Sequence, residues 1–281
     1  MGIIAGSRLR ASPFNTSAFV IEVDSTESGT SNNDQFQFTG AQGEYDVVAK
    51  QNGTQVATFN DLSNQETITL PSSGVYDLEV SAKASNGFNR IAFNNGGDKL
   101  KITDIKQWGK VVWSSFERAF FRCSNMLVTA TDVPNLSNVT NMSLMFFSAS
   151  SANPDTSNWD VSSVTSMYYM FYNTSSANPD VSNWDVSSVT DMRFMFFAAS
   201  SANPNTTNWD ISNVTSMNRM LENSNLSEEN LTACYENWSQ LNLQQNVAFG
   251  AGNTKYNASG QAGRDILVNT YNWIIEDGGQ V

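Results

Sequence analysis

Short runs of alternating apolar and polar residues dominate the first third of the chain. Phe19, Ile21 and Val23 alternate with polar neighbours. The same alternation recurs in three later runs, at Phe36 and Phe38, at Ile68 and Leu70, and at Val75, Leu78 and Val80. Segments rich in Gly, Asn, Ser and Asp, such as KQNGTQ and PSSG, separate these runs. Because a strand sends successive side chains to opposite faces, residues 15–105 predict an antiparallel β-sandwich of about seven strands.

A longer period replaces this alternation from about Trp113 onward. Valine, tryptophan, methionine and proline return every 25 residues, at Val139, Val164, Val189 and Val214, at Trp159, Trp184 and Trp209, at Met142, Met167, Met192 and Met217, and at Pro154, Pro179 and Pro204. The segment WSSFERAFFRCSNM is a degenerate earlier copy, displaced by 26 residues. Self-similarity at this period is typical of a solenoid in which each copy forms one coil. Residues 106–226 therefore predict a solenoid of about five coils.

One coil carries too few apolar residues to bury them by itself. Met167, Met170, Phe171 and Thr174 follow the spacing of one face of a short helical turn. Stacking on neighbouring coils would bury such residues in a continuous core, which stabilises the fold by roughly 1.5–3 kcal/mol for each Met or Phe.

The repeat stops after Asn225, and a different pattern follows. Ser227 stands where an N-cap is expected, Glu228 and Glu229 fall in the first turn, and a helical apolar face follows at Leu231, Cys234, Tyr235 and Trp238. The segment NVAFGAGNTKYNASG indicates a strand and turn, and GRDILVNTYNWIIEDGG indicates a second short helix and a final strand. We expect residues 227–281 to form a small α+β cap on the solenoid.

Charge and composition narrow the possible partners. The chain of 281 residues has a formal net charge of −12 and no histidine. An acidic chain is repelled by phosphate backbones, so we expect no nucleic-acid partner. The lack of histidine excludes Ser-His-Asp triads and His-ligated metal sites. No apolar stretch is long enough to span a bilayer, so no membrane insertion is expected.

The chain has two cysteines, Cys123 and Cys234, and lacks the series of spaced cysteines typical of disulfide-rich proteins. Two unpaired thiols are therefore favoured over a disulfide bond.

The repeated run NWDVSSVTSMYYMFYNTSS resembles the BspA-type leucine-rich repeat, also called the Mycoplasma-lipoprotein surface repeat. The segments DKLKITDIKQWGKVVWSSFERAFFRCSNM and NLSEENLTACYENWSQLNLQQNVAFGAGNTKY resemble that family's entry into and exit from the repeats, so the resemblance covers roughly residues 85–281. The preceding sandwich looks similar to PKD-like or Ig-like domains, although VVAKQNG replaces their usual turn. The resemblance implies surface-displayed proteins that act in adhesion, including copies in phage structural proteins. It brings no catalytic residue and no cofactor, so we expect a non-enzymatic protein.

The N-terminal segment MGIIAGSRLRASPF lacks the pattern of a signal peptide. Secreted members of the resembled family carry such signals, whereas virion proteins do not need them. We therefore expect a phage virion structural protein, a fibre, spike or other appendage, with residues 1–14 as an arm that anchors it to other virion proteins. The expected location is the virion, the expected partner is a host surface glycan or protein, and a homo-oligomer is possible. The alternative is a bacterial cell-surface adhesin whose signal is missing from this chain.

The letters that vary between copies are the candidates for binding. They follow the first repeat methionine and the Met-Phe pair, and the predicted binding residues are Tyr168, Tyr169, Tyr172, Arg193, Phe194 and Phe197. Aromatic and arginine side chains are typical of recognition surfaces, and aromatic faces also stack on sugars. The other interpretation is that Phe147, Tyr172 and Phe197 are partly buried core.

The repeated aspartates Asp160, Asp185 and Asp210 also permit two interpretations. Recurring oxygen ligands could bind Ca²⁺, but no Asp-x-Asp-x-Asp loop is present, and Asx turns that satisfy backbone groups are favoured. We therefore predict no metal site. Methionines at helical spacing are predicted to fill the core. A pair of carboxylates for glycoside hydrolysis would have to face each other in a cleft, and the sequence singles out no such pair.

Overall fold

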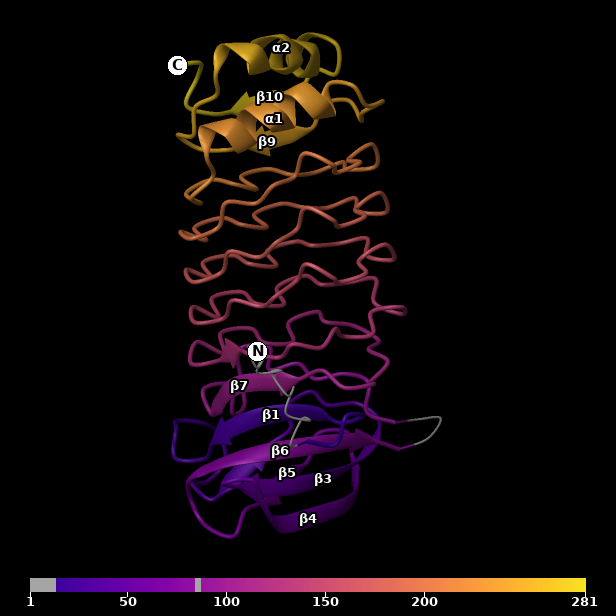
Figure 1. Cartoon of the computed structure of the whole chain (residues 1–281), viewed down its shortest axis with the longest axis vertical. Helices are drawn as coiled ribbons and strands as arrows, with labels where there is room; N and C mark the ends of the chain where they lie inside the picture. The colour runs from indigo at the N-terminus through magenta and orange to yellow at the C-terminus, as the bar shows by residue number, and fades with distance from the viewer. Residues whose placement is uncertain (1–13, 84–86) are drawn as a thin grey trace, which may run out of the picture.

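The computed structural model describes residues 14–83 and 87–281. The described chain is rich in β structure, with two short α-helices and no closed barrel. Figure 1 shows an elongated molecule with a sheet at one end, a stack of coils in the middle and the helices at the other end. The predicted anchoring arm at residues 1–14 lies outside the described residues, except for Phe14.

The largest sheet has the strand order β4-β3-β6-β1-β7-β8. Its pairs are antiparallel except for β7 and β8, which run parallel. In chain order these strands are β1 (Phe19–Asp24), β3 (Glu44–Gln51), β4 (Thr54–Ser63), β6 (Val75–Ala82), β7 (Ile102–Gln107) and β8 (Leu127–Val128). A separate antiparallel pair joins β2 (Gln35–Gln37) and β5 (Thr67–Thr69).

The alternating pattern explains most of these strands. Phe19, Ile21 and Val23 are buried in β1, as their spacing predicts. In β6 the prediction is wrong for Val75, which is 46% exposed, because Tyr76 takes the buried position instead. The β3–β4 hairpin turns at Asn52 and Gly53, where φ is +51° and +77°. Asn-Gly suits this left-handed turn.

Main-chain hydrogen bonds join successive coils. In the turn segment of each regular coil, alternate amides donate to a carbonyl 24 positions later, as in Tyr169 N–H to Arg193 O at 3.0 Å and Phe171 N–H to Met195 O at 2.8 Å. Isolated parallel bridges continue the same ladder through Asn141, Ser166, Asp191 and Ser216. Each 25-residue segment therefore lies directly on the next, as Figure 1 shows.

The expected helical turn from Met167 is wrong. Met170 N–H bonds to Met167 O at 3.1 Å, which closes a tight turn, and Tyr169 adopts φ +56°, in the left-handed region. A helix would direct its amides to carbonyls within the segment. Here the Tyr169 and Phe171 amides donate to the next coil instead. The spacing of three residues between the buried side chains therefore comes from consecutive tight turns.

The predicted burial of the repeat residues is confirmed. Val164, Met167, Met170 and Phe171 are completely buried. One aromatic column, Phe120, Phe146, Phe171 and Phe196, runs through the coils with ring centroids 5.4–5.7 Å apart. The column places the degenerate first copy in step with the later copies, and the methionines fill the core around it as predicted.

The last coil continues into a small α+β segment. Its elements are α1 (Glu228–Trp238), β9 (Ala248–Gly250), the 3₁₀ turn η1 (Ala258–Gly260), α2 (Gln261–Asn269) and β10 (Ile274–Glu276), which pairs parallel to β9. The predicted N-cap is confirmed, because the Ser227 side chain accepts from Asn230 N–H at 3.3 Å. Leu221 N–H donates to Gly250 O at 2.9 Å and ties the coils to β9.

The structure also bears on the predictions for the cysteines, the segment limits and membrane spans. Cys123 and Cys234 are unpaired and buried, as expected. The limits of the predicted segments, 15–105, 106–226 and 227–281, stay predictions, and β8 pairs with β7 across the first of them. In the described residues, no helix has the length and apolar character needed to cross a membrane.

Candidate functional site

The six candidate residues lie together on one side of the coil stack. They occupy the hydrogen-bonded turns of two successive coils, and each is half-buried. Phe121, Phe147 and Arg219 extend the same cluster into the neighbouring coils. We call these nine residues the aromatic face.

Four rings of the aromatic face form a continuous stack. Phe121, Phe147, Tyr172 and Phe197 follow one another at centroid distances of 4.6, 4.6 and 5.1 Å, with interplanar angles of 9° or less. Adjacent hydrogen-bonded strands lie about 4.7–4.9 Å apart, so the coil spacing itself brings the rings to stacking distance. Each such pair is worth about 0.5–1.5 kcal/mol beyond burial.

This stacking changes how the aromatic face can recognise a ligand. Phe147 and Tyr172 each have a ring neighbour on both sides, so other rings cover their faces. The expectation that these faces stack on sugars is therefore wrong for this column. The column can offer a ligand ring edges and the Tyr172 hydroxyl, and ring edges carry partial positive charge.

A second, shorter column lies beside the first. Tyr169 and Phe194 stack at 4.6 Å with an interplanar angle of 8°, and Tyr169 also packs edge-on against Tyr168 at 4.2 Å. Tyr169 and Phe194 both have φ +56°, a conformation that is uncommon for bulky residues. The equivalent left-handed position four residues later carries Asn173, which tolerates this conformation well. The two rings are therefore held against a backbone preference that asparagine would satisfy.

Two arginines frame the columns, each held by a carboxylate. The Arg193 guanidinium binds Asp191 through Nε and Nη2 at 3.0 and 2.7 Å and lies 4.7 Å from the Tyr168 ring centroid. Arg219 binds Glu222 at 2.6 and 2.8 Å and lies 4.6 Å from the Phe197 ring centroid, closing the end of the stack. These carboxylates raise the pKa of both arginines.

The Tyr169 hydroxyl stays protonated at physiological pH. Burial among neighbouring rings raises the pKa of Tyr169 to about 12, and its contact with Tyr168 acts in the same direction. A neutral phenol both donates and accepts a hydrogen bond. The aromatic face thus combines apolar ring edges, hydroxyl groups and fixed guanidinium groups, which is the chemistry of a recognition surface.

Three members of the aromatic face are not among the six predicted binding residues. Phe147 and Arg219 also occupy positions that vary between copies, but the prediction did not include them. Phe121 lies in the degenerate first copy, outside the regular copies that supplied the candidate residues. Phe120 stacks on Phe146 in the core, and the next residue in each copy, Phe121 and Phe147, stacks in the same way.

The repeated aspartates serve the backbone. The Oδ1 atoms of Asp160, Asp185 and Asp210 accept from the amide two residues later, at 3.0–3.2 Å, which confirms the Asx turns. In the described residues, no group of three His, Cys, Asp or Glu side chains could hold a metal ion.

Asp185 and Asp210 also line a shallow hollow of about 310 Å³. The hydrogen bonds from Ser187 lower the Asp185 pKa, which is the opposite of what a general acid requires.

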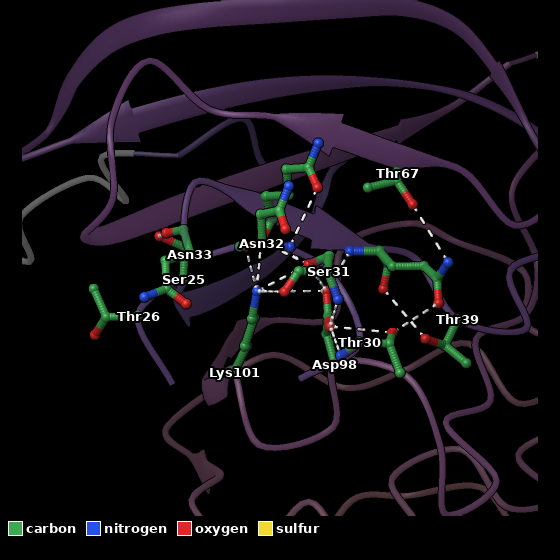
Figure 2. Close-up of polar contacts among 12 residues, drawn as sticks. Ser25, Thr26, Thr30, Ser31, Asn32, Asn33, Thr39, Thr67, Asp98 and Lys101 are labelled. Atoms are coloured by element: carbon green, nitrogen blue, oxygen red, sulfur yellow. Dashed lines mark hydrogen bonds and ion pairs between the residues drawn. The ribbon is translucent and has the colours of Figure 1, made fainter. Parts of the chain in front are cut away.

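A second polar cluster lies inside the sheet end of the molecule (Figure 2). Lys101 and Asp98 are both completely buried, and Lys101 Nζ lies 3.9 Å from Asp98 Oδ2. The ammonium lies within hydrogen-bond distance of four loop oxygens, Ser31 O, Ser31 Oγ, Asn32 O and Gln35 O, at 2.8–3.1 Å. Burial lowers the Lys101 pKa. Four converging oxygens resemble the ligand set of a bound cation, and the lysine takes that role here.

Asp98 completes this cluster from the other side. Its carboxylate accepts from the amides of Thr30, Ser31 and Gln37 at 2.7–3.0 Å. An added Cβ at Gly29 would come within 2.3 Å of Asp98 Oδ1, so glycine lets the loop approach this closely. The pair fixes the loop between β1 and β2, and no polar group of the aromatic face belongs to it. We assign it a structural role.

Comparison with known proteins adds one finding. A family described as Mycoplasma protein of unknown function (DUF285) matches residues 114–234, less than half of the chain. No curated protein and no solved structure matches. The matched range contains all nine residues of the aromatic face. The match is compatible with the BspA-type family that the repeat motif resembles.

Proposed function

We propose that this protein is a non-enzymatic attachment module whose aromatic face binds a surface glycan. The observation that carries the proposal is the aromatic face itself, in which the residues that vary between copies form one continuous half-buried surface. The invariant residues fill the core. Sequence variation is thus concentrated where a partner could make contact.

A repeating polymer suits this surface better than a single compact ligand. The coils repeat by translation, and the exposed ring edges follow at centroid steps of 4.6–5.1 Å. A polysaccharide could make related contacts at successive coils, which raises affinity through multivalency. The hydroxyl and guanidinium groups would fix its orientation through hydrogen bonds.

For the architecture, we propose a BspA-type leucine-rich-repeat solenoid that an Ig-like or PKD-like sandwich covers at one end. The six-stranded sheet together with the β2–β5 pair supports the sandwich. The hydrogen-bond ladder between coils supports the solenoid. Helices α1 and α2 would close the opposite end, as solenoids require.

Tyr169 and Phe194, which adopt a positive φ that bulky residues disfavour, allow a direct test of binding. Tyr169→Asn with Phe194→Asn removes both rings while keeping residues that accept positive φ, as Asn173 already does. We expect this double variant to lose at least about tenfold in affinity for target cells and for a glycan array. Val133→Ala, an exposed apolar position outside the aromatic face, is the matched control and should bind normally. Unchanged binding by a correctly folded double variant would refute the proposal.

Chemical or enzymatic treatment of the target cells distinguishes a glycan partner from a protein partner. Periodate treatment of the cells should abolish binding, because it destroys vicinal diols of sugars. Loss of binding after protease treatment alone would instead indicate a protein receptor.

The location of the protein is a separate proposal, either a phage virion or a bacterial cell surface. Labelling of purified virions would place the protein on a phage appendage, and labelling of intact bacteria would place it on a cell surface.

A further inference from the structure

One half-buried arginine near the start of the coil stack has no partner. In the described residues, the Arg90 side chain makes no hydrogen bond or ion pair, and its Nε is buried. The other described arginines each have an acceptor: Arg118, Arg122, Arg193, Arg219 and Arg264. A guanidinium is always charged and carries five donors. The buried, unpaired Nε lowers the stability of the fold, because it has lost its hydrogen bonds to water and gained none in the protein.

Arg90 lines a hollow of about 280 Å³ that it shares with Arg118. Arg118 Nη1 donates to Asn94 Oδ1 at 2.8 Å, and its Nε lies 4.0 Å from the exposed Glu117 carboxylate. Asn94 and Glu117 also line the hollow. Two guanidinium groups therefore meet one carboxylate there, in a chain whose net charge is −12.

The main chain fixes both arginines. Gln42 N–H donates to Arg90 O at 3.2 Å, and Asn94 N–H donates to Arg118 O at 3.3 Å. Arg118 N–H continues the coil ladder to Ser143 O at 2.9 Å. The hollow is thus a pre-formed junction between the sheet and the first coil.

The hollow adjoins the aromatic face along the same line of coils. Arg118 has φ +55° and heads the left-handed positions that continue through Leu144, Tyr169, Phe194 and Arg219. Tyr169 follows two coils after Arg118, about 10 Å away at the usual strand spacing. A ligand lying on the Tyr169 and Phe194 rings could therefore extend into the hollow.

We propose that this hollow is a subsite for the carboxylate of an acidic saccharide whose neighbouring units lie on the aromatic face. The inference rests on the proposed glycan-binding function and names its ligand class. A planar carboxylate matches the fork of a guanidinium through two parallel hydrogen bonds. The Arg90 Nη groups have no protein partner among the described residues and supply the donors, and Arg118, which also lines the hollow, adds positive charge.

The test uses a glycan array that carries each acidic oligosaccharide beside its carboxyl-reduced form. Wild-type protein should bind the acidic member at least about tenfold more tightly than the reduced one, because charge-assisted hydrogen bonds are lost on reduction. Arg90→Met should abolish that difference while leaving the binding of neutral members unchanged and without lowering the melting temperature. Methionine keeps an apolar stem of similar length, and Arg90 has no protein partner to lose among the described residues.

A second variant should act in the opposite direction. Glu117→Gln removes the one carboxylate of the hollow at an exposed position, and we expect acidic members to bind about threefold to fivefold more tightly. The inference is overturned if wild-type protein shows no preference for acidic members, binds none of them, or keeps its preference in Arg90→Met. If the Tyr169→Asn/Phe194→Asn variant still loses cell binding in those cases, the proposed function stands without this subsite.

Discussion

Replacing Lys101 with methionine should destabilise the sheet end of the molecule strongly. The change removes a buried ammonium and keeps the side-chain volume nearly constant. Four oxygens at 2.8–3.1 Å lose their donor, and the Asp98 carboxylate stays buried without a cation. The effect therefore comes from charge and hydrogen bonding, with little contribution from a cavity.

The magnitude follows from the burial of both partners. Breaking a buried ion pair by removing one member costs about 3–5 kcal/mol. A buried acceptor that loses its donor costs about 1–3 kcal/mol, but opening of the loop to water would relieve part of that cost. The amides of Thr30, Ser31 and Gln37 still donate to Asp98 and stabilise its charge. We therefore expect about 3–5 kcal/mol, a large share of the roughly 5–15 kcal/mol that stabilises a typical protein.

Native-state hydrogen exchange is the suitable assay, since the stacked coils and the sheet need not unfold together. The amides of Thr30, Ser31 and Gln37 should exchange faster in Lys101→Met by a factor that corresponds to this loss. Lys106→Met is the control: Lys106 binds Glu22 and Asp77 at 2.6 and 2.7 Å but is 24% exposed. Such partly exposed pairs contribute about 1 kcal/mol or less. If Lys101→Met costs no more than Lys106→Met, the structural role of the buried pair is refuted.

Three further predictions concern the coils and helix α1. Hydrogen bonds from neighbouring serines lower the pKa values of Asp155, Asp180 and Asp185; their stabilisation is present above the unfolded pKa near 4 and should be lost as pH falls through the lower folded values, which melting temperatures between pH 5 and 2 would show. Phe171→Ala should lower the free energy of unfolding by about 3–5 kcal/mol in a denaturant titration, since Phe171 is completely buried between Phe146 and Phe196. Burial raises the pKa of Cys234 to about 12, so a thiol reagent at pH 8 should modify it only after unfolding, and rapid modification of the native protein would contradict its placement.

The 25-residue period predicted the spacing of the coils because a stacked segment must present the same side chains to its neighbours. Val164, Met167 and Phe171 are buried for that reason. The local conformation within a coil was harder to predict from the sequence. Apolar residues three positions apart occur both in helices and in consecutive tight turns. Only the left-handed conformation at Tyr169, set by hydrogen bonds to the next coil, distinguishes the two.

The candidate site was predictable in position and less so in geometry. Variable letters identified Tyr168, Tyr169 and Arg193, which the structure places in contact. The mutual stacking of Phe147, Tyr172 and Phe197 could not be read from the sequence, because it depends on the distance between coils. Arg90 gave no signal at all: it lies outside the repeat, and its importance comes from the lack of a partner for its buried Nε among the described residues.

Hydroxyl-radical footprinting with a purified surface polysaccharide from target cells tests the central claim most directly, because it reports the accessibility of individual aromatic side chains. Tyr168, Tyr169, Tyr172 and Phe194 are half-buried and should be oxidised in the free protein. We predict that the polysaccharide protects these four residues, while half-buried Tyr271, which follows α2, reacts unchanged. Protection confined to other surfaces, or equal oxidation with and without the polysaccharide, would contradict the account.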